Sequence, residues 1–154
     1  MKIKLFTVAG VCVFTSLSLS AAHAADNCTG YDVTVDTHTE TTEFGKDHSL
    51  TIVHNASILT SEDMPTYHLS TGDCTGSVLA TPDGKAQATG HCIRRDKDGD
   101  TWSIEWVLPS GTDKGTWKST GGTGKHAGKR HSGWWQEVRR DGKMGVSKWG
   151  GNCK

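Results

Sequence analysis

A tight turn near the middle of the chain determines how the residues on either side of it can pair. Residues 81–85 read TPDGK, with proline at the first turn position and glycine where the backbone needs a positive φ. This pattern is typical of a three-residue β-hairpin loop. If Thr81 pairs with Lys85, the numbers of paired residues sum to 166, and Cys74 lies opposite Cys92. Opposed residues on neighbouring strands are within disulfide reach, so we predict a bridge between these two cysteines.

The remaining cysteines predict a second disulfide. The chain has five cysteines, and Cys12 lies in an apolar N-terminal run. Once Cys74 and Cys92 are paired, Cys28 and Cys153 remain, so we predict that they join the first strand to the last. Four cysteines outside the N-terminal run are typical of a protein folded in an oxidising compartment. A bridge between the two ends favours a sheet that closes on itself.

Residues 1–24 have the features of an export signal, namely two early lysines, an apolar run and a small-x-small site at 22–24. Cleavage after Ala24 would leave residues 25–154, a length of 130 residues that predicts a single domain in the periplasm or outside the cell. The remaining 15 basic and 17 acidic side chains give a net charge of −2, which argues against a nucleic-acid partner. No other apolar run approaches the ~20 residues of a membrane span, so we expect no membrane insertion.

Short alternating runs separated by turn residues continue along the rest of the chain. They predict seven to nine antiparallel strands and an all-β fold. The first strands are expected at 31–36 and 50–58, with a break at 41–46, and a further short run is expected at 67–70. The predicted architecture is an antiparallel up-and-down β-barrel, with a β-sandwich as the alternative.

Two further hairpins predict which side chains face inward. A turn at 96–100 pairs Arg95 with Thr101, so that Cys92 lies opposite Ile104 and Gly90 opposite Trp106 on an apolar inner face. His91 and Glu105 then form a polar pair on the outer face.

The last hairpin is expected at Asp141-Gly142, a pair typical of a two-residue turn, with Arg140 opposite Lys143. This register places Trp134 opposite Trp149 on the apolar face and turns Trp135 the other way.

The glycine-rich segment 115–133 joins two tryptophan-bearing runs, and we interpret it as a corner of the sheet. Its basic side chains could also make it a ligand-contacting loop that faces an anion. These side chains are Lys125, His126, Lys129, Arg130 and His131. A nucleotide-binding phosphate loop is excluded, because Ser119 and His126 occupy positions where that motif needs glycine and a hydroxyl residue.

The same segment resembles the glycine-rich signature of small secreted barrels related to allene oxide cyclase and the plant dirigent proteins. The resemblance is carried by Gly115-Thr116-Trp117, TGGTGK at 120–125 and Ala127-Gly128. His91-Cys92 followed by Asp98-Gly99-Asp100 is similar to bacterial exported members of that group, and the resemblance covers about residues 90–133. It implies a calycin-like or allene oxide cyclase-like barrel. The plant relatives hold apolar or phenoxy ligands in the barrel, but their catalytic positions are not matched here, so the resemblance implies fold rather than activity.

The other groups of polar residues give weaker predictions of a functional site. Alternating aspartates at 96–100 are similar to the start of a calcium loop, but Val107 stands where such a loop needs a bidentate acid. We interpret them as a solvated turn, with a weak calcium site as the alternative. The seven histidines after residue 24 have no recognised catalytic metal spacing, so no metal and no other cofactor is predicted, with a metal or haem site on these histidines as the alternative. No nucleophile with a partner histidine is found.

The six tryptophans are more than a small core needs. Core packing is one use for them, and lining a pocket is the other. The candidates for pocket walls are Trp102, Trp106, Trp117 and Trp134. The main hypothesis is therefore a non-enzymatic binding protein for a small apolar or aromatic ligand. One alternative is an isomerase or cyclase in the same cavity, which needs an inward-facing acid or base. Another is an interaction protein that uses the basic loop 121–131 against an anionic surface.

Overall fold

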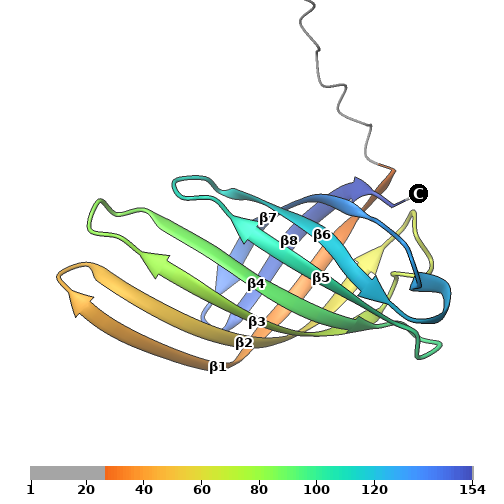
Figure 1. Ribbon diagram of the computed structural model, residues 1–154, viewed down its shortest axis with the longest axis horizontal. Helices are drawn as coiled ribbons and strands as arrows, with labels where there is room; N and C mark the ends of the chain where they lie inside the picture. The colour runs from red at the N-terminus through yellow and green to blue at the C-terminus, as the bar shows by residue number, and fades with distance from the viewer. Residues whose placement is uncertain (1–26, 154) are drawn as a thin grey trace, which may run out of the picture.

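The computed structural model describes residues 27–153, which form eight antiparallel strands closed into a barrel (Figure 1). The strands are connected in up-and-down order, and β1 pairs with β8 to close the sheet. They are β1 (Cys28–Gly45), β2 (His48–Ser61), β3 (Ser70–Ala80), β4 (Ala86–Arg95), β5 (Thr101–Leu108), β6 (Lys114–Gly122), β7 (Ser132–Asp141) and β8 (Met144–Asn152), with a short 3-10 helix, η1 (Gly124–His126), between β6 and β7. The all-β barrel confirms the predicted fold class. The predicted export signal lies outside the described residues.

The two ends of the barrel differ in the connections between strands that lie there (Figure 1). The β1–β2, β3–β4, β5–β6 and β7–β8 turns lie at one end, which we call the hairpin end. The connections at 62–69, 96–100 and 123–131 lie at the other end together with the two described ends of the chain. We call this the terminal end. In the part of the chain that the structure covers, no helix has the length and hydropathy of a membrane span.

Pairing around the central turn follows the predicted registers. Cys74 lies opposite Cys92, Cys92 opposite Ile104, and Gly90 opposite Trp106. Both predicted disulfides, Cys74–Cys92 and Cys28–Cys153, are formed. Two disulfides in a chain of this size indicate folding in an oxidising compartment.

The first hairpin is longer than predicted. The expected break at 41–46 is wrong, because β1 continues to Gly45 and pairs with β2 along this stretch. Thr41 and Thr42 are β-branched, which favours extended backbone, and Asp47 takes the left-handed turn position with φ 57°. The run at 67–70 is also not a strand, since Tyr67 lies in a turn and β3 begins only at Ser70.

The predicted register of the last hairpin is wrong by one residue at its tryptophans. Asp141 pairs with Met144, so the turn lies one residue later than predicted, and a bulge between Glu137 and Arg139 shifts the pairing again. Trp135 therefore lies opposite Trp149. Because successive residues of a strand face opposite sides, this shift exchanges the two tryptophans. Trp135 lines the interior, and Trp134 lies outside, with the Lys114 ammonium 4.1 Å from the centre of its ring.

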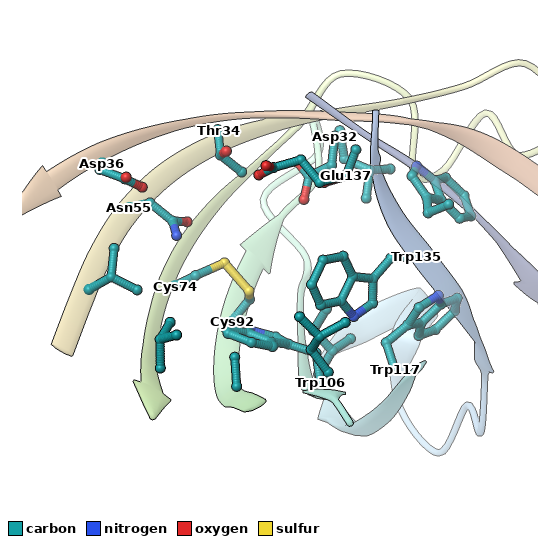
Figure 2. Close-up of a pocket in the computed structure, with 18 of the residues that line it drawn as sticks. Asp32, Thr34, Asp36, Asn55, Cys74, Cys92, Trp106, Trp117, Trp135 and Glu137 are labelled. Atoms are coloured by element: carbon teal, nitrogen blue, oxygen red, sulfur yellow. A yellow bond between two sulfur atoms is a disulfide. The ribbon is translucent and has the colours of Figure 1, made fainter. Parts of the chain in front are cut away.

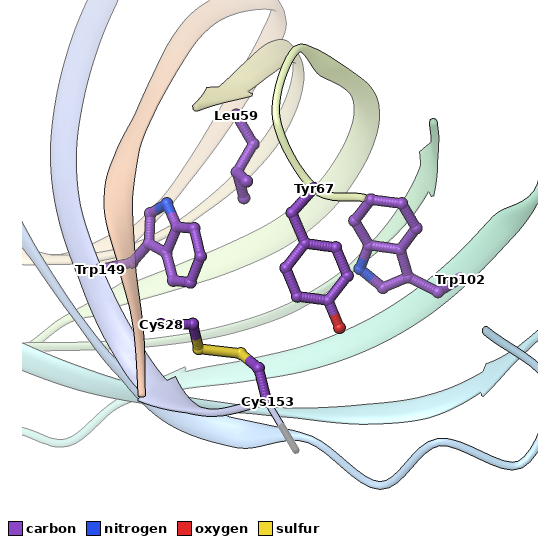
Figure 3. Close-up of a cluster of buried hydrophobic side chains, with 6 residues drawn as sticks. All are labelled: Cys28, Leu59, Tyr67, Trp102, Trp149 and Cys153. Atoms are coloured by element: carbon purple, nitrogen blue, oxygen red, sulfur yellow. A yellow bond between two sulfur atoms is a disulfide. The ribbon is translucent and has the colours of Figure 1, made fainter. Parts of the chain in front are cut away.

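A buried core fills the barrel at its terminal end (Figure 3). It consists of Cys28, Leu59, Tyr67, Trp102, Trp149 and Cys153. Tyr67 enters from the β2–β3 connection and stacks on Trp102, with 4.8 Å between ring centres. The disulfide between Cys28 and Cys153 packs in the same cluster, so the bond that links the two ends of the chain is also part of the core.

Candidate functional site

A cavity of about 640 Å³ occupies the barrel interior beyond this core. Tyr67, Trp102 and Trp149 form its inner boundary. At the hairpin end its lining includes the exposed residues Thr39 and Asp113, so the cavity reaches solvent there. Its volume is within the range of sites that hold small organic molecules.

Three tryptophans form an aromatic wall on one side of the cavity (Figure 2). Trp106 comes from β5, Trp117 from β6 and Trp135 from β7. Trp106 and Trp135 meet edge to face, with ring centres 5.8 Å apart and an angle of 85° between the rings. Such edge-to-face contacts stabilise aromatic pairs and fix their orientation.

Glycines on adjacent strands hold these indoles against the barrel wall. A Cβ placed on Gly90 would lie 2.4 Å from Cζ2 of Trp106, and one placed on Gly115 would lie 2.3 Å from Cε2 of Trp135. The indoles therefore occupy space that the missing side chains leave at the wall. This arrangement explains why a barrel so rich in tryptophan keeps an open lumen.

The opposite side of the cavity is a polar wall built mainly on β1. In this strand Asp32 and Asp36 line the cavity, whereas Val33 and Val35 are exposed on the outside. Figure 2 shows Asp32 and Asp36 across the lumen from the tryptophans, whereas Glu137 lines the cavity on β7, two residues after Trp135. The strand therefore has an inverted pattern, with polar residues inside and apolar residues outside.

Arginines accompany the carboxylates of the polar wall. Arg94 is 2% exposed and binds Asp32 and the hydroxyl of Ser57. Arg140 contacts two carboxylates, with Nη1 3.1 Å from Asp36 Oδ2 and Nη2 2.6 Å from Glu137 Oε2. The hydrogen bond to Glu137 raises the pKa of Arg140, and Asp36 adds to this effect. Arg140 therefore stays positively charged beside its two partners.

Some buried polar atoms at the cavity have no hydrogen-bond partner within residues 27–153. They include Oδ1 of Asn55, which lies beside Asp36 in the β1–β2 register, and Nε1 of both Trp135 and Trp149. The two indole nitrogens lie against the wall, near Gly115 and Gly30 respectively. Asn55 instead points toward the lumen (Figure 2).

The structure brings together three of the four tryptophans proposed from the sequence as pocket walls. Trp102, Trp106 and Trp117 line the cavity, whereas Trp134 does not. Sequence reasoning missed Trp135, whose inward orientation depends on the bulge in β7. It also missed the polar wall, because alternating carboxylates on a strand usually indicate a solvent-exposed face.

The basic loop 121–131 is largely engaged in contacts within the chain. Lys125 Nζ lies 2.5 Å from Asp98 Oδ2 and 3.0 Å from Asp96 Oδ2, and His126 Nε2 lies 2.9 Å from the same Asp96 oxygen. His131 is buried, and its Nδ1 forms a hydrogen bond with the hydroxyl of Tyr67. Of the five basic side chains in the loop, the structure leaves Lys129 and Arg130 exposed.

The turn at 96–100 is exposed at residues 97–99, whereas Asp96 at its start is buried. The side chain of Asp96 is 1% exposed and accepts hydrogen bonds from the backbone N–H groups of Asp98 and Asp100. Burial alone would raise the pKa of Asp96, but hydrogen bonds from His126, Lys125 and the Asp98 N–H outweigh it and lower that pKa to about 2. Over residues 27–153, no group of three or more His, Cys, Asp or Glu side chains is arranged to hold a metal ion.

The fold and the cavity define a class of protein, a closed eight-stranded antiparallel barrel with a lumen open at one end. No protein-family model and no curated protein matches the sequence. Among solved structures, the barrel is similar to a pterocarpan synthase dirigent protein, with a TM-score of 0.50 and 11% sequence identity over 94% of this chain and 96% of that one. This likeness supports the dirigent-like barrel that the glycine-rich segment implied, at the level of the fold alone.

Proposed function

We propose that this protein is exported and binds a small apolar or aromatic ligand inside its barrel. The observation that carries the proposal is the cavity of about 640 Å³, which Trp106, Trp117 and Trp135 line without filling. A ligand in this lumen would bury apolar surface against the tryptophans, and such burial contributes about 25 cal/mol per Å². The signal-like sequence at 1–24 and the two disulfides support export.

A ligand-binding assay on two matched variants tests the proposal. Ala88 and Thr89 are neighbours on β4; Ala88 is buried and lines the lumen, whereas Thr89 is exposed. N-phenyl-1-naphthylamine, a neutral aromatic dye, is titrated into each protein and its emission is recorded with direct excitation. Ala88→Phe places a phenyl ring in the lumen and should weaken dye binding by at least about tenfold, whereas Thr89→Phe should leave it unchanged. Absence of dye binding, or equal loss in both variants, would contradict the proposal.

Native mass spectrometry of the protein from its natural source complements this assay. A small molecule that is retained by the wild type and absent from Ala88→Phe would identify the cargo. If the same molecule is retained by both proteins, it is bound outside the lumen, and the proposal fails.

Catalysis of the isomerase or cyclase type is a second candidate function for the same cavity. It requires an inward-facing acid or base, and Asp32, Asp36 and Glu137 provide carboxylates in the lumen. The test is to incubate excess recovered ligand with a small amount of protein and to look for a rearranged product of the same mass. Turnover that is lost in Glu137→Gln would support catalysis, and unchanged ligand after long incubation would restrict the protein to binding.

A further inference from the structure

We propose that the ligand of this lumen is an organic cation, with an aromatic or apolar body and a protonated amine or quaternary ammonium group. This inference rests on the proposed ligand-binding function and adds the chemical class of the ligand. It follows from the charge of the lining, from an unpartnered acceptor and from the aromatic wall.

The charged side chains of the lining are unequal in number. Four are acidic and two are guanidinium groups, which gives a net charge of −2. They are Asp32, Asp36, Asp113 and Glu137 against Arg94 and Arg140. The cavity therefore has an excess of negative charge before any ligand enters, and a cationic ligand would reduce it.

Each arginine of the lining already faces a carboxylate, although Nε of Arg94 has no hydrogen-bond partner among the described residues. Arg94 is almost fully buried and is bound to Asp32 and Ser57. Arg140 lies between Asp36 and Glu137, so one guanidinium group faces two carboxylates. The single positive charge of Arg140 balances only one of these two carboxylates. An anionic ligand near Arg140 would therefore be repelled by Asp36 and Glu137.

Asn55 adds an acceptor that a ligand could satisfy. Its Oδ1 is buried at the lining and has no hydrogen-bond partner among the described residues. It lies opposite Asp36 in the β1–β2 register. A buried acceptor without a donor costs about 1–3 kcal/mol, and an ammonium N–H placed between Asn55 and Asp36 would recover that cost.

The aromatic wall suits the rest of such a ligand. Trp106, Trp117 and Trp135 face the same lumen as the carboxylates, with Asp32 and Asp36 across from them on β1 and Glu137 beside Trp135 on β7 (Figure 2). Their faces can pack against an apolar body and also attract a cation through the ring quadrupole. Attraction between an ammonium group and a carboxylate is stronger at a partly enclosed site than in water, because the effective dielectric constant is lower.

Three probes of nearly equal shape test this inference. Phenylbutylammonium, phenylbutanol and phenylbutanoate share one aromatic body and differ in the charge of the head group. Their affinities for the wild-type protein are measured by isothermal titration calorimetry near neutral pH. We expect the ammonium compound to bind at least about tenfold more tightly than the alcohol, and the carboxylate to bind more weakly than the alcohol.

A pair of glutamate variants locates the effect. Glu137→Gln removes one carboxylate of the polar wall and should reduce the preference for the ammonium compound by about tenfold, with the affinity for the alcohol unchanged. Glu105→Gln is the control, because Glu105 lies on the outer face of β5, where it is paired with Lys118 at 2.5 Å and is opposite His91 as predicted. It should leave both affinities unchanged. Binding of the alcohol also shows that each variant is folded.

The outcomes separate this inference from the proposed function. If none of the three probes binds, the binding function itself fails and the inference fails with it. If the alcohol or the carboxylate binds as tightly as the ammonium compound, the lumen binds ligands but the cationic class is wrong. A preference that persists in Glu137→Gln, or is lost in Glu105→Gln, also overturns the inference.

Discussion

The inward-facing tryptophans of this barrel lie next to glycines. Trp106 lies over Gly76 and Gly90, and Trp135 lies over Gly115. Each glycine removes the side chain that would otherwise push the indole toward the barrel axis. At the scale of the residue, the free volume of the lumen therefore depends on positions that carry no side chain.

Replacing Gly90 by alanine tests this relation. The added Cβ would lie 2.4 Å from Trp106 Cζ2 and 2.5 Å from the carbonyl oxygen of Thr75, so both the indole and the backbone must shift. We expect a loss of about 1–3 kcal/mol in the free energy of unfolding, measured by urea denaturation. Gly121→Ala is the matched control, since its Cβ would meet Ser103 Oγ at an ordinary 3.5 Å. Equal effects of the two substitutions would contradict the role of Gly90.

The buried pair of His131 and Tyr67 should make stability depend on pH. Burial lowers the pKa of His131, and the positive charge of Lys129 lowers it further. The unfolded chain, with an ordinary value of 6.5, then takes up a proton at a higher pH than the folded chain does. Stability should be fully present above that value and should fall as the pH drops below it.

The measurement is the urea midpoint at about pH 7.5 and at about pH 5.5, on either side of the ordinary histidine pKa. We expect the midpoint of the wild type to be lower at the acidic pH, and His131→Asn to reduce this difference. His91→Asn serves as the control, because His91 is exposed on the outer face. If His131→Asn keeps the full difference, this histidine is not its source.

At the scale of the element, Asp96 ties the β4–β5 turn to η1. Its carboxylate binds the side chain of His126 from η1 and that of Lys125, as well as two N–H groups of its own turn. The sequence offered two separate features here, an acidic turn and a basic glycine-rich loop. In the structure each is the partner of the other.

Asp96→Asn should therefore destabilise the fold by about 2 kcal/mol, because it removes the negative charge of the carboxylate that accepts these hydrogen bonds. Asp98→Asn changes a neighbouring residue that is 58% exposed and should cost less than about 1 kcal/mol. Because the folded pKa of Asp96 is lowered from 3.8 to about 2, its contribution is present above the ordinary value and is lost as pH falls toward the folded one. Urea unfolding of both variants near neutral pH would measure the difference, and similar losses would refute the distinction.

The elements also show where sequence reasoning succeeds. The turns at 81–85 and 96–100 have residues that allow one pairing each, and both registers were predicted correctly. At Asp141-Gly142 the turn residues allow two neighbouring registers, and a bulge in β7 adds a further shift that leaves no clear mark in the sequence. The inward orientation of Asp32 and Asp36 depends on a lumen that only the closed barrel creates, so local patterns could not reveal it.

At the scale of the whole molecule, the two disulfides should contribute unequally to stability. Cys28–Cys153 spans 125 residues and Cys74–Cys92 spans 18. In the chain-entropy account, a longer closed loop restricts the unfolded chain more, and these spans correspond to about 5 and about 3 kcal/mol. We expect the double variant Cys28→Ala/Cys153→Ala to lose more stability in urea than Cys74→Ala/Cys92→Ala. The reverse order would show that local packing around each bridge dominates.

The separation of the two ends of the barrel has a practical consequence. Cys28 and Cys153 lie together at the terminal end, and the mouth of the cavity lies at the hairpin end. A fusion partner or surface linker attached after residue 153 would leave from the side opposite the mouth. Molecules immobilised in this way would all present their mouths to the solution, so the barrel is suited to display as an oriented receptor layer.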